Sequence, residues 1–198
     1  MVDKKIASGE SEYKIRYQIR NGVEVLRSDY EMVGDCQIGI DLNHVGHLNN
    51  KLDKQVKFDI SFLNIARLWS QNSHAKRRKT GCLIVKNYSI ISDGYNGTPI
   101  GMDNNCEDEN GETKWHVLHA ETNAISKLAK SNQSSDGATL YTTFSPCKNC
   151  AKLILQSGIV RVVYMDEHSD TDGLVLLAKA GIQISRYQLD DCTIVHNK

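Results

Sequence analysis

A regular change between helix-type and strand-type hydrophobic patterns runs from residue 58 to residue 187, and it constrains the fold more than any other feature of this chain. Alternation of helices and strands with short connections predicts a mixed sheet, largely parallel in its later part, with helices on its faces. We therefore expect an α/β fold with a mixed five-stranded sheet. The expected elements are helix 58–71, strands 82–85 and 89–92, helix 119–131, strand 138–144, helix 147–158, strand 159–165, helix 172–181 and strand 182–187.

The first 57 residues follow a different pattern. Residues 12–27 alternate apolar and polar side chains with period two around Asn21-Gly22, a pair that suits a tight turn, so they predict a β-hairpin. Residues 35–57 are polar and weakly periodic, which is typical of a connector. We divide the chain into an N-terminal arm, 1–57, and a main domain, 58–198. The arm could add an edge to the sheet, contact another subunit or act in regulation.

Charge and composition narrow the classes of partner. The 24 basic and 24 acidic residues cancel, so no overall field attracts nucleic acid or a membrane surface, and we expect neither as a partner. The N-terminus does not resemble a signal peptide and no apolar run approaches about 18 residues, so we expect a cytoplasmic protein. In such a reducing compartment the six cysteines favour thiols or metal ligands over disulfides.

Two short motifs stand at the starts of consecutive predicted helices. His119-Ala120-Glu121 opens the first, and Pro146-Cys147-Lys148-Asn149-Cys150 opens the second, with one strand between them. Two such helices flanking one strand would bring their N-terminal ends together. His119, Cys147 and Cys150 then form three metal ligands, a number typical of a catalytic zinc site that keeps a position for water.

Glu121 follows the histidine by two residues and is better placed beside the open position than as a ligand. This H-x-E…P-C-x-x-C arrangement is the zinc nucleobase deaminase signature. Zinc lowers the pKa of its water, and Glu121 would carry a proton to the pyrimidine ring and then to the departing ammonia. A redox Cys-x-x-C pair is the alternative, but it leaves His119 and Glu121 without a role.

Four longer stretches resemble the deoxycytidylate (dCMP) deaminase family: GYNGTP (94–99), DNNCEDE (103–109), VLHAETNAI (117–125) and SPCKNCAKLILQSGI (145–159). The resemblance covers about residues 61–187. It implies a cytidine-deaminase-like three-layer α/β/α sandwich and hydrolysis of dCMP to dUMP and ammonia for thymidylate synthesis. It also implies Zn²⁺ as cofactor and a homo-oligomer, often a hexamer. Control by dCTP and dTTP near the GYNG loop, and Mg²⁺ with the regulatory nucleotide, are further implications.

The same resemblance suggests residues that contact substrate. It implies that Asn96 bonds the sugar and that the Ala120 backbone and Ser145 orient the pyrimidine. His168 stands near where the family usually has a tyrosine that is thought to contact substrate, and a histidine could meet a phosphate. In the GYNG stretch, Gly94 and Gly97 could adopt positive φ and approach a ligand closely, with Tyr95 as a stacking face. An ordinary turn is the alternative interpretation.

Other candidates and rival functions stay open at this point. His74, Cys106 and His116 are spare ligand types for a second, structural zinc, although solvated or core residues fit their irregular spacing better. The basic run Lys76-Arg77-Arg78-Lys79 suits a solvated helix end or a nucleotide-phosphate contact. The rival functions are deamination of another substrate (cytidine, dCTP, a modified deoxycytidylate or adenosine in tRNA) and a non-catalytic zinc or nucleotide-binding protein.

Overall fold

The computed structural model describes residues 3–6, 13–20, 23–26 and 45–187, with side chains from residue 54 onward. The helices are α1 (Val45–Ser70), α2 (Ala120–Leu128), α3 (Lys148–Gln156) and α4 (Asp172–Lys179). The strands are β1 (Asp3–Ile6), β2 (Tyr13–Arg20), β3 (Val23–Leu26), β4 (Gly81–Lys86), β5 (Ser89–Tyr95), β6 (Thr139–Phe144), β7 (Arg161–Asp166) and β8 (Gln183–Arg186).

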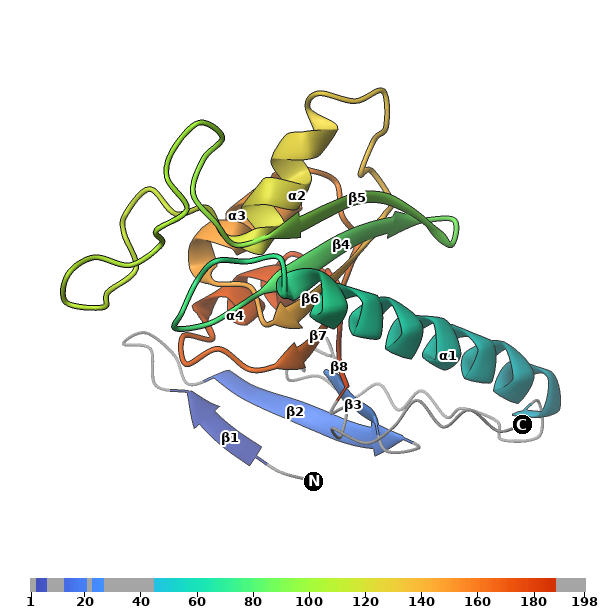
Figure 1. Cartoon of the computed structure of the whole chain (residues 1–198). Coiled ribbons are helices and arrows are strands. Elements are labelled where there is room, and N and C mark those ends of the chain that lie inside the picture. The colour runs from blue at the N-terminus through green and yellow to red at the C-terminus, as the bar shows by residue number, and fades with distance from the viewer. Residues whose placement is uncertain (1–2, 7–12, 21–22, 27–44, 188–198) are drawn as a thin grey trace, which may run out of the picture.

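The predicted five-stranded sheet is confirmed, in the order β8-β7-β6-β4-β5 (Figure 1). Strands β6, β7 and β8 are parallel, whereas β4 runs antiparallel to both β5 and β6. The turn between β4 and β5 holds Asn87 and Tyr88 at φ 52° and 62°. Helices α3 and α4 end just before Gly158 and Gly181, which have φ values of 75° and 78° and so adopt the left-handed conformation that glycine tolerates best.

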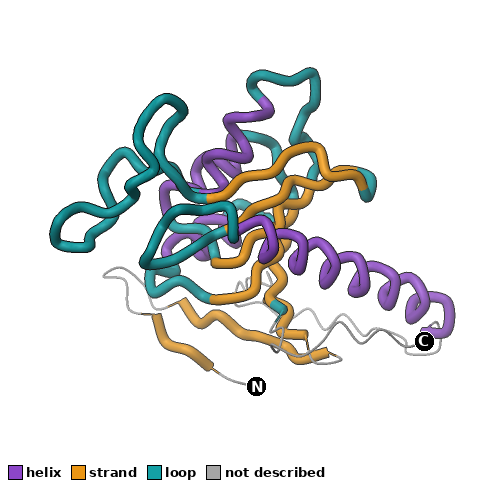
Figure 2. The backbone as a smooth tube through the Cα atoms, in the orientation of Figure 1, coloured by secondary structure: helices purple, strands orange, loops and turns teal. Residues whose placement is uncertain are grey.

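Helices cover both faces of this sheet, which gives the predicted three layers (Figures 1 and 2). Alternate strand residues face opposite layers: in β4, Cys82 and Ile84 pack in the core with α2, α3 and α4, while Leu83 and Val85 pack against α1. Because both faces of the sheet are covered by helices, successive residues of β4 are buried on opposite faces, and the strand is almost continuously hydrophobic.

The N-terminal strands continue the same sheet. Strands β2 and β3 form the predicted antiparallel pair, and β3 pairs antiparallel with β8, so the structure places the hairpin as an added edge. Residues 21 and 22, the predicted turn, lie outside the described residues. The predicted connector at 35–57 is wrong from residue 45 onward, because α1 begins at Val45, and the proposed domain boundary falls inside this helix. No described helix is both long enough and apolar enough to cross a membrane.

Candidate active site

His119 and Cys147, one from each predicted motif, occupy equivalent positions at the starts of α2 and α3. His119 is the N-cap of α2, with φ −73° and ψ 158°, and Cys147 is the N-cap of α3, with φ −69° and ψ 167°. Each has extended backbone, while its carbonyl already accepts the first intrahelical hydrogen bond, from Asn123 and Ala151. The ends of the two helices therefore meet, and Cys150 follows one turn inside α3.

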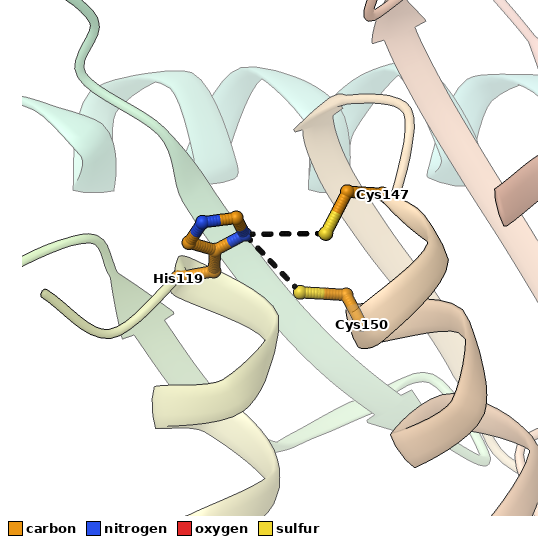
Figure 3. Close-up of side chains that lie close together, drawn as sticks. All are labelled: His119, Cys147 and Cys150. Carbon is orange, nitrogen blue, oxygen red and sulfur yellow. Dashed lines mark hydrogen bonds between the residues drawn. The ribbon is translucent and has the colours of Figure 1, made fainter. Parts of the chain in front are cut away.

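Three side-chain atoms converge at this meeting point (Figure 3). Nδ1 of His119 lies 3.5 Å from Sγ of Cys147 and 3.4 Å from Sγ of Cys150. A tetrahedral zinc ion, with bonds of about 2.1 Å to nitrogen and about 2.3 Å to sulfur, needs these atoms roughly 3.6 Å apart. The separations and the imidazole–thiolate donor set therefore fit Zn²⁺.

Among the described residues, this is the only group of three or more His, Cys, Asp and Glu side chains whose ligand atoms lie within 4.8 Å of one another. No fourth protein ligand joins it there. A set of three protein ligands is the arrangement of catalytic zinc sites, whereas structural sites are usually closed by four.

The thiol groups of Cys147 and Cys150 shift each other's pKa. The hydrogen bond from Cys150, with further help from His119, lowers the pKa of Cys147 to about 3. The hydrogen bond to Cys147 and burial raise the pKa of Cys150. The positive end of α3 also favours a thiolate at its first turn.

Glu121 lies beside the three ligand atoms in the first turn of α2. Its side chain is only 4% exposed, and burial raises the pKa of its carboxyl group. The hydroxyl of Thr142 in β6 donates a hydrogen bond of 3.5 Å to Oε1 of Glu121. A buried carboxyl with a raised pKa is suited to accept and return a proton near neutral pH.

A cavity of about 520 Å³ opens over this centre. Its walls include His119, Glu121 and Cys147, together with residues from the loops around the sheet edge. The four residues expected from the family resemblance to contact substrate also line it, namely Asn96, Ala120, Ser145 and His168. Two basic residues of the loop between α1 and β4, Arg77 and Arg78, complete one side of the cavity.

Ser145 and His168 are held together at the cavity wall. The hydroxyl of Ser145 accepts the backbone N–H of His168 at 2.7 Å. Nδ1 of His168 accepts the backbone N–H of Asp170 at 3.0 Å, so the neutral ring carries its proton on Nε2. His168 therefore has one ring nitrogen left to donate a hydrogen bond.

Residues 56–166 match the family model described as the cytidine and deoxycytidylate deaminase zinc-binding region. The chain belongs to this family. It is 35% identical to the deoxycytidylate deaminase of Enterobacteria phage T4 over 54% of its own length and 76% of that protein. It is 32% identical to the deoxycytidylate deaminase of Homo sapiens over 69% of its own length and 83% of that protein.

A solved structure of the same deaminase family gives a similar result. The chain resembles the dCMP deaminase of cyanophage S-TIM5, crystallised with dCMP and dUMP, at a TM-score of 0.65 and 44% identity. This match covers 66% of the chain and 96% of the cyanophage protein. The fold class expected from the sequence is thereby confirmed.

The backbone conformation of the GYNG motif in this deaminase differs from the one expected from the sequence. Neither Gly94 nor Gly97 has positive φ, so that expectation is wrong. A Cβ atom on Gly94 would lie 2.2 Å from the backbone oxygen of Ala120, so the glycine lets β5 pack directly on α2. The described residues that line the cavity do not include Gly94, Tyr95 or Gly97.

Asn96, the third residue of this motif, is tied to the loop between α1 and β4. Its Oδ1 accepts the backbone N–H of Thr80 at 2.8 Å, and its Nδ2 donates to the backbone oxygen of Arg78 at 2.9 Å. The amide thus holds the loop, and one N–H of Nδ2 is left for a ligand.

The candidates for a second metal site do not come together in the part of the chain that the structure describes. Cys106 is buried in a small apolar cluster with Ala75 and Val117, whereas His74 is exposed. The alternative interpretation of these residues as core and solvated positions fits this arrangement.

Sequence reasoning did not predict the contacts that three side chains make at the deaminase site. These side chains are Thr142, which reaches Glu121, Arg78, whose guanidinium lies 4.4 Å from the ring centroid of Phe144, and Glu107, a buried acid in the loop before α2. No local pattern marks the roles of Thr142 and Glu107, because a threonine in a strand and an acid in a polar loop usually face solvent. Glu107 lies in the DNNCEDE stretch that resembles the family, but the stretch does not show which of its acids is buried. The basic run that contains Arg78 was noticed, but not its contact with Phe144.

Proposed function

We propose that this chain is a zinc-dependent enzyme that hydrolyses dCMP to dUMP and ammonia, and so supplies dUMP for thymidylate synthesis. The observation that carries the proposal is a buried carboxyl group, Glu121, beside three converging ligand atoms at the floor of a cavity that also presents arginines. The naming of relatives as deoxycytidylate deaminases and the cyanophage structure with dCMP and dUMP support the choice of substrate.

In this proposal His119, Cys147 and Cys150 hold the metal through Nδ1 and two sulfur atoms. Bound zinc supplies a water-derived nucleophile at neutral pH. The ligands come from two helix N-termini, whose dipoles favour the thiolates and so help to retain the ion.

Glu121 moves the protons of the reaction. Water adds to C4 of the cytosine ring, and Glu121 takes one proton from this water and transfers it to N3 of the ring. Glu121 then carries the second proton to the exocyclic amino group, the C4–N bond breaks, and ammonia leaves with a keto oxygen remaining on C4. The buried position of Glu121 suits this role because its raised pKa lets it both accept and release a proton.

The cavity walls bind the rest of the nucleotide. The proton on Nε2 of His168, the hydroxyl of Ser145 and the free N–H of Asn96 offer hydrogen bonds to the base, sugar or phosphate. Arg77 and Arg78 line the cavity wall, with the Arg77 guanidinium paired with Glu112 and the Arg78 guanidinium over the Phe144 ring. Guanidinium groups bind phosphate in a bidentate manner, so a substrate phosphate would compete with Glu112 for Arg77. A monophosphate substrate therefore suits this cavity better than a free nucleoside.

Ammonia release from dCMP, dCTP and cytidine, measured with and without a metal chelator, tests the proposal. We expect turnover of dCMP in preference to the other two, loss of turnover with the chelator, and recovery when Zn²⁺ is added back. If dCMP were inert while cytidine or dCTP released ammonia, the enzyme would be a deaminase with another substrate and the dCMP assignment would be wrong.

A second experiment separates an enzyme from a non-catalytic zinc or nucleotide-binding protein. Glu121→Gln keeps the size of the side chain but removes its ability to accept a proton. We expect turnover to fall by at least about 10³-fold, with the bound zinc measured by elemental analysis unchanged. Unchanged biological function in this variant would support a binding protein instead.

Assembly and regulation are further parts of the proposal, and they rest on the family resemblance. We expect a homo-oligomer, with a hexamer as the form implied by the resemblance, in the cytoplasm. We further expect dCTP as an activator and dTTP as an inhibitor, with Mg²⁺ bound to the regulatory nucleotide. Hyperbolic saturation by dCMP that neither dCTP nor dTTP alters would refute the regulatory part, and a monomer in sedimentation analysis would refute the assembly.

A further inference from the structure

One buried acid, Glu107, holds the backbone of the loop that carries the cavity arginines. The backbone N–H groups of Lys76 and Arg77 both donate to the same oxygen, Oε1 of Glu107, at 2.8 Å and 3.2 Å. Glu107 lies about thirty residues further along the chain, between β5 and α2, and is only 5% exposed. Its other oxygen, Oε2, is buried and has no hydrogen-bond partner among the described residues.

The position of Glu107 is itself fixed from both sides. Glu107 forms an isolated antiparallel bridge with Thr113, and the preceding residue, Cys106, packs in a buried cluster with Ala75 and Val117. Burial of a carboxylate is costly unless hydrogen bonds compensate it, and those from backbone N–H groups to a charged oxygen are among the stronger ones. Among the described residues, the donors to this carboxylate are the two backbone N–H groups of the loop, so the burial of Glu107 and the conformation of the loop depend on each other.

That loop is clamped at two points. Glu107 fixes it at Lys76 and Arg77, and Asn96 fixes it at Arg78 and Thr80 through the two hydrogen bonds described above. Two of the clamped residues, Arg77 and Arg78, line the cavity. The guanidinium of Arg77 pairs with Glu112, and that of Arg78 lies over the ring of Phe144. Without an acceptor at Oε1, the backbone N–H groups of Lys76 and Arg77 would lose this partner, and the loop would regain conformational freedom at these residues.

We propose that Glu107 is a positioning residue, whose carboxylate fixes the loop so that Arg77 and Arg78 face the phosphate of the bound nucleotide. This inference rests on the proposed function, because it takes a nucleoside monophosphate as the substrate. Glu107 acts through the loop and does not contact the reacting atoms. Its loss therefore weakens recognition of the phosphate and leaves binding of the nucleoside part intact.

The test compares Glu107→Ala and Glu107→Gln with Glu109→Ala, an exposed acid two residues away that serves as the matched control. We measure kcat and KM for dCMP, and the dissociation constants of dUMP and of deoxyuridine, which lacks the phosphate. We expect Glu107→Ala to raise KM for dCMP and Kd for dUMP at least tenfold, with Kd for deoxyuridine unchanged. Glu107→Gln keeps an oxygen for both N–H groups and stays within about threefold of the wild type, and Glu109→Ala matches the wild type.

A double-mutant cycle with Arg77→Ala/Arg78→Ala keeps the proposal falsifiable even if Glu107→Ala is poorly folded, because Glu107→Asp can take its place. Asp is one methylene shorter and cannot hold both N–H groups, so we expect it to behave like Ala, and to have no added effect on KM once both arginines are removed. Equal losses for dUMP and deoxyuridine, or wild-type values in Glu107→Ala, would overturn the inference. Failure of the wild-type protein to turn over dCMP would instead overturn the proposed function.

Discussion

Asp59 of α1 and Arg161 of β7 form a bidentate ion pair beneath the sheet, with N–O distances of 2.8 Å and 2.6 Å. The Asp59 side chain is fully buried, and Arg161 is 11% exposed. The hydroxyl groups of Tyr141 and Tyr187 and the amide of Gln55 donate three further hydrogen bonds to the same carboxylate. These contacts fix α1 on the face of the sheet opposite to α2, α3 and α4.

The first prediction concerns the stability that depends on this pair. Asp59→Asn removes the negative charge and leaves the Arg161 guanidinium buried without a counter-ion, so we expect the free energy of unfolding to fall by about 3 kcal/mol. Denaturant unfolding at neutral pH measures the change. Asp59→Asn/Arg161→Gln should lose less than the sum of the two single changes, and strict additivity would contradict the expected coupling.

The second prediction concerns acid. Burial alone would raise the pKa of Asp59, but the hydrogen bonds and charge of Arg161, with Tyr141 and Gln55, hold this pKa below its ordinary value. Because the unfolded carboxyl titrates at about 3.9, the stabilisation is fully present above about pH 5. It is lost as the pH falls through the lower pKa of the folded state.

Unfolding measured from pH 7 down to about pH 3 checks this prediction. The difference in unfolding free energy between the wild type and Asp59→Asn should shrink as the pH falls. Any loss of metal in acid affects both proteins alike and cancels in this comparison. A constant difference over the whole range would show that the charge of Asp59 does not contribute.

The third prediction separates the two glycines of the GYNG motif. A Cβ at Gly94 would collide with backbone atoms of α2, at 2.2 Å and 2.6 Å, whereas a Cβ at Gly97 would meet only the ring of Tyr95, at 3.9 Å. We expect Gly94→Ala to reduce the free energy of unfolding by about 2 kcal/mol or more, and Gly97→Ala to change it by less than about 0.5 kcal/mol. Equal effects in thermal unfolding would contradict a packing role specific to Gly94.

The fourth prediction concerns the hydroxyl group that reaches Glu121. Thr142→Val keeps the shape of the fully buried side chain but removes the donor to Oε1 of Glu121. One hydrogen bond contributes about 1 kcal/mol net, so we expect kcat to fall about fivefold, with KM for dCMP nearly unchanged. Thr142→Ser restores the donor and should recover most of kcat. A serine variant as slow as the valine variant would indicate lost packing instead.

Most elements of the fold could be predicted, because their signals are local. Short apolar runs located β4, β6 and β7, and glycines after the last helical turn marked the ends of α3 and α4. The start of α1 was not predicted, although Val45, Leu48, Leu52 and Val56 recur at intervals of three and four residues. Because glycine or polar residues fill every position between them, this helical signal is weaker than that of the apolar stripe that begins at Phe58. Asp59 sits next to that stripe, and its partner Arg161 lies 102 residues away in β7.

The sequence by itself determined the elements and the three ligand types, because helix and strand periods and the spacing within H-x-E and P-C-x-x-C are properties of neighbouring residues. Only the tertiary structure decided which polar groups are buried and what they hold. Glu107 bonds to Lys76 and Arg77, Thr142 bonds to Glu121, and Gly94 packs on α2. Each of these contacts joins residues more than twenty positions apart, and such distances are set by how the sheet and its helices pack, which no local pattern encodes.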